Sequence, residues 1–491
     1  SPVSSLACRR SGGPRSRRRT SPVPVLLVAV VAILLLPGAL AVSLPNLYRT
    51  QFAFAQPHLT YAATASLGSN VGSHAANPFF AVEFNAAGLG PNSAAALGRY
   101  FNSTPFTWFR LGEGGHGYDP TTQVNWIAPA SGSGKYVADD TVMVNFTWFK
   151  SWCYSRTPHC QWIGTLPAEQ NDSAAAVHYA DYFHNVLHFA PSAWQMGNEP
   201  SAWVHYGINV TQWSTSDSSK TNGIGYATMV GDYITAVSNL YPSDRFIGIE
   251  ANCACNPDMV TTTASVDGPQ LWAMAYHSYP WANDSSNKTS QFMGALQSPT
   301  RNLSYTADRM RTLVTNGCAT CTNMAIQVGE YNAGPVPVHS PLALTYSGAP
   351  FIAASVIEAL QANVSMFTLF SLGWLYNTSN AHLLPEGILY QQILNNLTMG
   401  TDYLVNVKSP GVGGVYAMLI QQGTHESLLI VNTNNTKAIT LPISTSLFPV
   451  GLKGSTWSWD PRTTLPYVQT GITLPTTYTL WSQGILLINN Y

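Results

Sequence analysis

Glutamate is scarce in this chain, and its placement is therefore informative. The 491 residues include nine Glu, and five of them lie at or near the ends of short β-type runs: Glu83, Glu113, Glu199, Glu250 and Glu330. A chain this poor in Glu does not use it to coat its surface, so these carboxylates are candidates for chemistry. Two facing carboxyls can divide such work, because one can give a proton to a leaving oxygen while the other attacks the carbon.

Two of these glutamates lie in distinctive surroundings. Glu199 ends the stretch Trp-Gln-Met-Gly-Asn-Glu before Pro200, and Glu330 lies in Gln-Val-Gly-Glu-Tyr-Asn. Cleavage of a glycosidic bond with retention of configuration needs two carboxyls about 5–5.5 Å apart. Glu199 and Glu330 are the predicted pair, although Gly-Asn-Glu-Pro by itself is also compatible with an ordinary turn.

The elements that must position these residues alternate between β-type runs and helical patterns. We expect strands at Phe79–Asn85, Phe106–Gly112, Thr141–Trp148, Ala193–Asn198, Arg245–Ala251, Ala273–Tyr279, Met324–Glu330 and Ser365–Leu372. Helical patterns lie at Ser173–Ala190, Gly225–Leu240, Thr306–Thr315, Pro350–Ala362 and Glu386–Leu397. This alternation predicts an α/β fold, a (β/α)8 TIM barrel over residues 76–400. The helix after the fifth strand is poorly marked, and a doubly wound sheet is the alternative, but no Gly-rich phosphate loop follows the first strand.

The carboxyl ends of barrel strands form the mouth where such proteins place their chemistry. Strands four and seven lie on opposing sides of that mouth. Glu199 and Glu330 can therefore face each other across a bound sugar.

The pattern changes after Gly400, where short β-type runs with Gly, Pro and Asn turns replace the helices. The runs are Gly414–Ile420, Ser427–Asn432, Ala438–Pro442, Ser455–Asp460 and Tyr478–Ile488. They predict that the barrel is followed by an antiparallel β-sandwich domain over residues 401–491. The segment 42–75 is poor in helical pattern and is expected to join the sandwich.

The order of these motifs resembles clan A glycoside hydrolases, which are retaining barrel enzymes. Asn198-Glu199-Pro200 matches the acid/base signature on strand four, and Gly329-Glu330 matches the nucleophile signature on strand seven. The resemblance implies that Glu199 is the general acid/base, that Glu330 is the nucleophile, and that Asn198 binds the sugar 2-hydroxyl.

Four further residues extend the resemblance. It implies that Arg110, on strand two, lowers the pKa of the nucleophile, and that His277 and Tyr279, on strand six, contribute to the site, with Tyr279 bonding the nucleophile. Trp374, after strand eight, would form an aromatic platform under the sugar. Taken singly, three of them have a purely structural alternative: an ion pair with Glu83 for Arg110, a satisfied core histidine for His277, and core packing for Trp374.

Families with a barrel plus a β-sandwich are the nearest in pattern. They are the heparanase and β-glucuronidase family 79, with the β-xylosidase and arabinofuranosidase families 39 and 51 as other candidates. The stretch from Arg110 to Gly115, with Asp119, resembles the strand-two loop of the glucuronidase type. Pro335 and Pro337, however, remove two backbone donors where that family cradles the uronate carboxylate, and Glu83 and Glu113 suit neutral hydroxyls better.

The predicted function is a secreted retaining glycoside hydrolase that cleaves β-linked sugars, with β-glucuronidase-like activity as one option. The alternative is a non-catalytic carbohydrate-binding cell-surface protein on a glycosidase-like barrel. The expected partner is an oligosaccharide, polysaccharide or glycoside. No cofactor or metal is expected, because there is no His-Glu-x-x-His motif and no Asp-rich calcium loop.

Composition narrows the class of protein further. Only 9% of the residues are charged, against about 25% in an ordinary soluble protein, and 45% are hydrophobic, which excludes disorder. With only seven Lys, the chain lacks the basic patch that nucleic-acid-binding proteins need. Such a weakly charged surface also predicts tolerance of acidic surroundings.

The N-terminal sequence indicates export. Six Arg before position 20 precede an apolar run, Val25–Leu36, and a small-x-small site ends at Ala41. This layout predicts a signal peptide over residues 1–41 and an extracellular location. A retained anchor is the alternative, but the run is shorter than the ~20 residues that span a bilayer, so no stable membrane span is expected after cleavage.

Cysteines and glycosylation sequons agree with export. Cys153 and Cys160 can close a local disulfide loop, and Cys253, Cys255, Cys318 and Cys321 can pair with one another or locally. A redox or zinc pair at Cys318 and Cys321 is the alternative. Eleven Asn-x-Ser/Thr sequons predict a glycoprotein: Asn102, Asn145, Asn171, Asn209, Asn283, Asn287, Asn302, Asn363, Asn377, Asn396 and Asn434.

Overall fold

The computed structural model describes most of the chain beyond residue 58. The described residues are 59–74, 79–84, 98, 100–111, 118–119, 124–127, 137–139, 146–168, 171–200, 223–252, 256–280, 293–298, 302–334, 346–370, 372–377, 382–397, 399–443, 447, 453–459, 467–473 and 476–490. The predicted signal segment, Glu113, Cys253 and Cys255 lie outside them. No helix of the described part combines the length and apolar character needed to cross a membrane.

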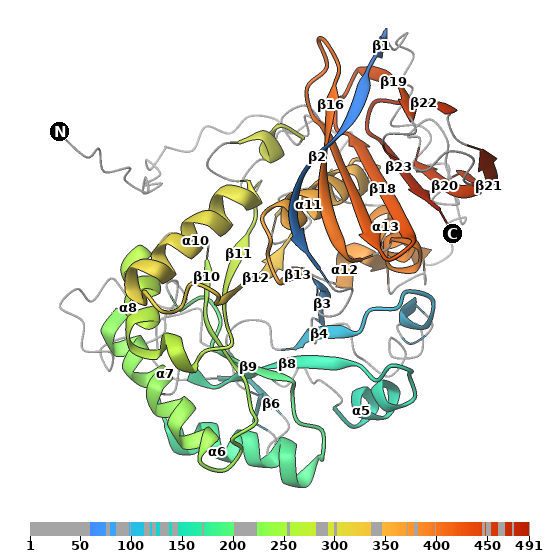
Figure 1. Ribbon diagram of the computed structural model, residues 1–491. Coiled ribbons are helices and arrows are strands. Elements are labelled where there is room, and N and C mark those ends of the chain that lie inside the picture. Colours follow the sequence, from blue (N-terminus) through green and yellow to red (C-terminus); the bar gives the residue numbers. More distant parts are fainter. Residues whose placement is uncertain are drawn as a thin grey trace, which may run out of the picture. The chain divides into compact units, whose positions relative to one another are not determined.

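Eight parallel strands close into a barrel in chain order (Figure 1). They are β3 (Phe80–Phe84), β4 (Trp108–Leu111), β8 (Gln161–Leu166), β9 (Ala193–Met196), β10 (Phe246–Asn252), β11 (Ala273–Ser278), β12 (Ala325–Tyr331) and β13 (Met366–Leu369). Pairing of β13 with β3 closes the ring, with Phe367 opposite Phe80. The expected (β/α)8 barrel is confirmed.

The third barrel strand is not where its sequence pattern places it. Of the expected strand Thr141–Trp148, the described part belongs to helix α5 (Phe146–Tyr154), and the strand is β8. Aromatic and β-branched residues favour a strand by propensity. In α5, however, Phe149, Trp152 and Cys153 recur at helical spacing and are all buried, so packing of one helix face prevails.

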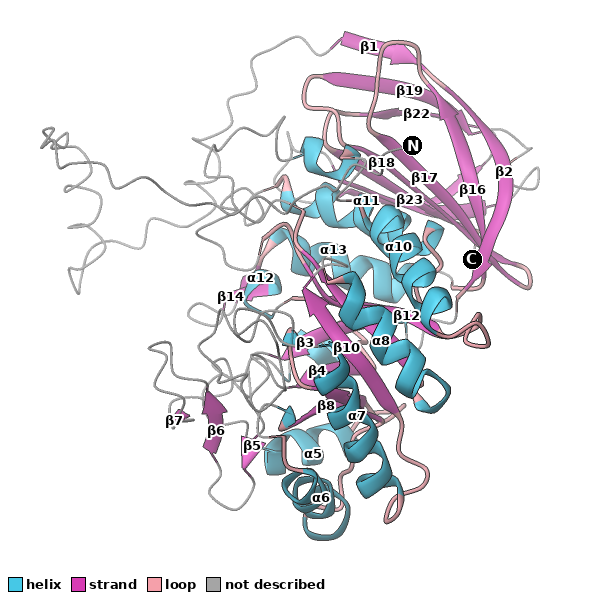
Figure 2. Cartoon of the chain, turned by 90° about the vertical axis from the view of Figure 1, so that its left-hand side faces the viewer, coloured by secondary structure: helices cyan, strands magenta, loops and turns pink. Residues whose placement is uncertain are grey.

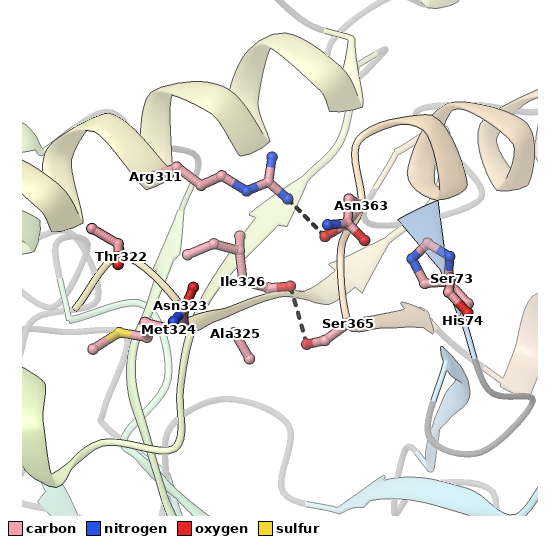
Figure 3. Close-up of a pocket in the computed structure, with 10 residues that line it drawn as sticks. All are labelled: Ser73, His74, Arg311, Thr322, Asn323, Met324, Ala325, Ile326, Asn363 and Ser365. Carbon is pink, nitrogen blue, oxygen red and sulfur yellow. Dashed lines mark hydrogen bonds between the residues drawn. The ribbon is translucent and has the colours of Figure 1, made fainter. Parts of the chain in front are cut away.

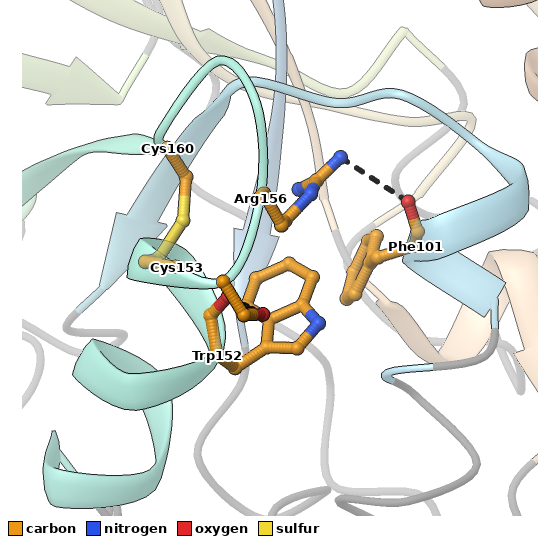
Figure 4. Close-up of a disulfide and its surroundings, with 6 residues drawn as sticks. Phe101, Trp152, Cys153, Arg156 and Cys160 are labelled. Atoms are coloured by element: carbon orange, nitrogen blue, oxygen red, sulfur yellow. Dashed lines mark hydrogen bonds between the residues drawn. A yellow bond between two sulfur atoms is a disulfide. The ribbon is translucent and has the colours of Figure 1, made fainter.

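A disulfide joins α5 to the approach of β8 (Figure 4). Cys153 bonds Cys160, as expected from their spacing. Inside the loop that they close, Arg156 lies 4.7 Å from the ring centroid of Trp152 and donates to the Phe101 carbonyl. The loop is thereby held against the helix that precedes β4.

The helices between the strands follow the expected order. They are α6 (Ser173–Asp181), extended by the π-helix η4 (Tyr182–Val186), α7 (Gly223–Ser238), α8 (Pro257–Asp267), α10 (Leu303–Gly317), α11 (Gly348–Gln361), α12 (Leu372–Leu375) and α13 (Pro385–Asn396), with short 3-10 turns η8 (Gly268–Gln270) and η9 (Ala295–Gln297). The poorly marked helix after the fifth strand is α8. Its signals are a capping side chain, since Asn256 accepts from the Met259 amide, and Pro257 in the first turn.

Short β-pairs complete the barrel part of the chain. The strands β5 (Tyr118–Asp119), β6 (Val124–Ile127) and β7 (Val137–Asp139) form one small sheet, and β14 (Tyr376–Asn377) pairs with β15 (His382–Leu383). Cys318 and Cys321 form a local disulfide just beyond α10. Their thiols are therefore not zinc ligands here.

Two further sheets form the sandwich. The larger has the strand order β2 (Thr64–Ser73), β16 (Thr401–Lys408), β17 (Val415–Gln422), β18 (His425–Asn432), β23 (Gly484–Asn489), β20 (Lys453–Trp459) and β21 (Tyr467–Thr473). The smaller consists of β1 (Leu59–Ala62), β19 (Lys437–Ile443) and β22 (Thr476–Leu480). The expected single run Tyr478–Ile488 is two strands, β22 and β23, and the sequence pattern does not mark β16 or β21.

The larger sheet is covered on both faces. In β18, Leu428 and Ile430 pack into the core between the two sheets, whereas Leu429 and Val431 join the main barrel core. The same period-two division holds in β17 and β23, as the pleat of a strand requires. The second face lies against α11 (Figure 2). That helix is buried from Gly348 to Leu360, which explains why it is apolar on all sides.

One ionisable side chain is buried on this helix. Glu358 is 6% exposed, and the amide of Leu303 donates to its carboxylate at 3.4 Å. Burial raises the pKa of Glu358 from 4.5 to about 8. The folded protein therefore keeps a proton on Glu358 at pH values where the unfolded chain has lost it.

We predict that replacing Glu358 by Gln weakens the pH dependence of stability. A carboxyl with a raised folded pKa contributes stability that is present below its unfolded pKa and is lost as pH rises through the folded pKa. Here the window runs from pH 4.5 to about 8 and corresponds to roughly 5 kcal/mol. Urea unfolding at pH 5 and pH 8 should show a smaller difference for Glu358→Gln than for the wild type.

The matched control is Asp308→Asn, which removes a carboxylate whose side chain is 74% exposed. This variant should show the same difference in the free energy of unfolding between pH 5 and pH 8 as the wild type. If all three proteins showed the same difference between pH 5 and pH 8, the pH dependence of stability could not be assigned to Glu358.

Candidate active site

The site is built on the inward face of the barrel strands. A core cluster inside the ring includes Ala81, Trp108, Ala193 and Ala275, one from each of β3, β4, β9 and β11. Two residues further along these strands lie Glu83, Arg110, Gln195 and His277. Because side chains alternate along a strand, the polar set continues the same face at the carboxyl ends of the strands, where barrel proteins place their sites.

Arg110 is the central cation of this set. It is fully buried, and each nitrogen of its guanidinium donates: Nε to Gln195 Oε1 at 2.7 Å, Nη2 to Asn198 Oδ1 at 2.6 Å, and Nη1 to Glu330 Oε1 at 2.6 Å. Nη1 also pairs with Glu83. Burial alone would lower the pKa of Arg110, but Glu83, Glu330 and Glu250 raise it well above its ordinary value.

His277 is the second cation. Its Nδ1 lies 2.8 Å from Glu199 Oε1 and 3.1 Å from Glu330 Oε2, and its Nε2 lies 2.9 Å from Glu250 Oε2. Burial would lower the pKa of this ring, but Glu330 and the hydrogen bonds to the three carboxylates raise it well above its ordinary value. A raised pKa favours the charged imidazole over the neutral one at neutral pH.

Glu199 lies on a sharp turn beyond β9. Gly197 and Glu199 both have positive φ, of 73° and 46°, and the Glu199 amide donates to the Glu250 carbonyl at 3.1 Å. A left-handed conformation is uncommon outside glycine and occurs where the surroundings impose it. The turn directs Glu199 toward His277.

Glu330 is held as a carboxylate near the end of β12. Arg110, His277 and the Tyr279 hydroxyl, at 2.5 Å from Oε2, surround its two oxygens. Burial would raise the pKa of Glu330, but the charges of His277 and Arg110 lower it to about 2. A buried, ionised carboxylate with donors on both oxygens has the protonation state that a nucleophile requires.

Glu199 and Glu330 lie close enough to act on one bond. Each presents a carboxylate oxygen, and these two atoms lie within 4.8 Å of each other and of a nitrogen of His277. Retaining glycosidases place their carboxyls about 5–5.5 Å apart and inverting enzymes about 6.5–9.5 Å apart. An oxygen–oxygen separation below 4.8 Å is closer to the first spacing than to the second. The same three atoms could hold a metal ion only if His277 lost the Nδ1 proton that it shares with the two glutamates.

The other expected site residues take different places. Glu83 is buried and bonds Arg110, so it holds the arginine in this structure. Trp374 is 2% exposed and packs in the main core, so its ring offers no open face to a sugar here. Glu113 lies outside the described residues.

The sequence assigns no role to two residues of the site. Gln195 accepts from Arg110, and Glu250 accepts from His277. The only signal for Gln195 is its place two residues after an inward Ala193. Glu250 is marked as one of the scarce glutamates, but nothing in its neighbours reveals its partner.

A cavity of about 450 Å³ lies at the opposite end of β12, where this strand begins (Figure 3). Ser73, His74, Arg311, Asn363 and Ser365 are among the residues that line it. None of the residues around Glu199 and Glu330 belongs to it.

Comparison with solved structures identifies the fold. A family 51 α-L-arabinofuranosidase from Bifidobacterium longum has a TM-score of 0.63 and 13% identity over 88% of this chain and 100% of its own. A family 44 xyloglucanase from Paenibacillus polymyxa has a TM-score of 0.63 and 13% identity over 88% and 99%. A GH39 enzyme from Xanthomonas axonopodis pv. citri has a TM-score of 0.57 and 12% identity over 88% and 98%.

No family model and no curated protein sequence matches this chain. The structural neighbours are glycoside hydrolases of clan A, as the resemblance of the motifs implies. The chain has their fold: a (β/α)8 barrel with a β-sandwich.

We predict that replacement of Arg110 destabilises the protein strongly. Arg110→Met keeps the volume but leaves Glu83 and Glu330 without their shared cation, which should lower the free energy of unfolding by about 3–5 kcal/mol. Arg110→Lys should lose less, because one ammonium keeps the charge but cannot supply the three-way fork. Urea unfolding at pH 7 measures both.

Arg309→Met serves as the control, because Arg309 is exposed on α10. A surface replacement of this kind should change the free energy of unfolding by less than about 0.5 kcal/mol. A loss at Arg110 as small as that at Arg309 would show that the buried network does not depend on this cation.

Proposed function

We propose that this protein is a retaining glycoside hydrolase in which Glu330 is the nucleophile and Glu199 is the general acid/base. The observation that carries the proposal is the pair of carboxylate oxygens within 4.8 Å of each other at the barrel mouth. The distinct surroundings of the two groups support the division of roles. Two cations and a tyrosine hold Glu330 ionised.

In the first step, Glu330 attacks the anomeric carbon and forms an ester bond to it. The bond from that carbon to the glycosidic oxygen breaks, and Glu199 gives this oxygen its proton. Arg110 fixes Asn198 through its Oδ1, so the NH2 end of the amide is the one that donates to the sugar 2-hydroxyl. That bond strengthens in the transition state.

In the second step, Glu199 takes a proton from water, and the water oxygen attacks the same carbon. The ester bond breaks and returns Glu330 to its carboxylate form, so two inversions give net retention. While Glu330 is esterified, its negative charge is absent. The positive charges of Arg110 and His277 then act on Glu199, which favours its role as a base.

The charges of the site favour a neutral sugar. Glu83, Glu199, Glu250 and Glu330 face two cations, and both cations are bonded to glutamates. Within the described part of the site, neither cation is left for the carboxylate of a glucuronic acid. We therefore propose a β-linked neutral sugar as the substrate, and a glucuronide as the weaker option.

We predict that Glu330→Gln and Glu199→Gln each abolish hydrolysis while the fold persists. The measurement is the rate at which the phenol is released from a panel of aryl β-glycosides. Glycosides of neutral sugars should be cleaved faster than the glucuronide. A 2-fluoro sugar should label Glu330 covalently in the wild type, because the fluorine slows hydrolysis of the ester. Azide should restore turnover to Glu199→Ala, since this small nucleophile needs no general base.

Glu358→Gln is the matched control and should keep full activity, because the carboxyl of Glu358 bonds the Leu303 amide and Tyr416 and none of the site residues. A wild-type protein that binds sugars but neither turns them over nor becomes labelled would favour the alternative, a carbohydrate-binding protein on a glycosidase-like barrel.

We further propose that the protein is secreted and glycosylated. Two disulfides, Cys153–Cys160 and Cys318–Cys321, support an oxidising location. Among the sequons that the structure describes, Asn102, Asn171 and Asn363 are exposed. Asn396 is partly buried, and its amide nitrogen donates to Gln392.

We predict glycans at Asn171 and Asn363 and none at Asn396 in protein secreted from a eukaryotic host. Enzymatic deglycosylation in heavy-oxygen water converts each occupied Asn to a labelled Asp, which peptide mass spectrometry locates. Occupancy at Asn396 with bare Asn171 and Asn363 would contradict the prediction.

A further inference from the structure

Glu250 lies behind His277, away from the two proposed catalytic carboxyls. It is fully buried on β10. Its Oε2 lies 2.9 Å from His277 Nε2 and 4.0 Å from Arg110 Nη2, and its Oε1 has no hydrogen-bond partner among the described residues. A carboxylate placed in this way, with a single close donor, depends on that donor for its stability.

The ring of His277 thus has carboxylates on both sides. Glu199 and Glu330 face Nδ1, and Glu250 faces Nε2. A neutral imidazole has one donor and one acceptor nitrogen, so a neutral ring would turn a lone pair toward a carboxylate. Only the doubly protonated ring donates in both directions.

The backbone is shaped to hold Glu250 in this place. The pairing of β10 with β11 contains a bulge between Gly248 and Ala251, and Ile249 has a φ of 65°. A β-branched residue in the left-handed region is a true outlier, a strained conformation that persists only where the surrounding structure imposes it. The bulge is tied by Tyr226, which accepts from the Ile249 amide and donates to the Met196 carbonyl on β9.

Strand β12, which lies on the other side of β11 from β10, makes room for the carboxylate. A Cβ on Gly329 would lie 1.9 Å from Glu250 Oε2. Any side chain at position 329 would therefore displace Glu250. The residue before the proposed nucleophile must be glycine for Glu250 to reach His277.

We propose that Glu250 is a positioning residue that holds His277 as a doubly protonated imidazolium between Glu199 and Glu330. Its side chain fixes the ring, and its carbonyl accepts from the Glu199 amide. The groups that face the ring are Glu199, Glu330 and Glu250, with Arg110 and Tyr279 bonded to Glu330. The kinetic part of this inference rests on the proposed glycosidase activity.

The protonation of His277 can be measured without any activity. In protein labelled with nitrogen-15 in histidine, with the His277 signals assigned by their loss in His277→Asn, we expect both ring nitrogens to remain protonated from pH 5 to pH 8. In Glu250→Gln, the amide can donate to Nε2, so His277 should become neutral within this range. A neutral His277 in the wild type at pH 7 would overturn the proposal.

Kinetics separates this role from a merely structural one. For Glu250→Gln we expect kcat/KM near the wild-type value at pH 5, where His277 regains its proton. At pH 8 we expect a loss of about 10- to 100-fold, the range found for outer partners that orient a metal-bound histidine. Glu358→Gln replaces another buried glutamate and should show no such trend. A loss that is the same at both pH values would refute the role.

A double-mutant cycle tests the contact at Gly329. Gly329→Ala should reduce kcat/KM in the wild type but add little in Glu250→Ala, which has already lost the displaced carboxylate. If Gly329→Ala reduced kcat/KM equally in the wild type and in Glu250→Ala, position 329 would not act through Glu250. If the wild type cleaves no glycoside, the proposed function fails, whereas a charged His277 that becomes neutral in Glu250→Gln still supports the role of Glu250.

Discussion

Two buried cations shared by four buried glutamates are the interaction on which the barrel mouth depends. An isolated carboxylate in the interior is costly, and Glu83, Glu250 and Glu330 are each 4% exposed or less. Arg110 and His277 can offset that cost because each touches several carboxylates at once. The four carboxylates therefore depend on two cations, and each cation holds more than one of them in place. Stability and chemistry therefore draw on the same few contacts.

The candidate site could be predicted where chemistry leaves a local sequence pattern. The neighbours of Glu199 and Glu330 form recognisable motifs, and the structure brings both together with Asn198, Arg110, His277 and Tyr279. Glu250 could not be assigned from sequence, because its place depends on a strand bulge and on the absence of a side chain at position 329. For Trp374 the sequence suggests a role that the structure does not support. Its position after the last strand suggests an aromatic platform, but packing of α12 buries the ring.

The fold could be predicted where periodicity and segment length agree. Seven barrel strands and most helices lie where the alternation indicates, since each buries a clear face. The third strand could not be located, because residues with strand propensity, such as Phe146 and Trp148, lie in α5. The first strand after the barrel, β16, is only partly buried, so its alternation is weak. The sequence of helix α11 is apolar on all sides, which predicts that the helix is buried. It does not indicate that the larger sheet of the sandwich covers it.

The route of the chain through the larger sheet has a consequence for folding during synthesis. Strand β2 pairs with β16, so that Ser73 lies opposite Thr401, and the whole barrel is made between them. At about 5–20 residues per second, a ribosome needs on the order of 15–65 seconds to supply the partner. Until then neither edge of β2 is paired, and β2 remains an edge strand in the finished sheet, the kind of surface that invites aggregation. Its sequence, Thr-Ala-Ser-Leu-Gly-Ser-Asn-Val-Gly-Ser, consists mostly of polar or small residues. The unpaired strand therefore has little apolar surface with which to aggregate before β16 is synthesised.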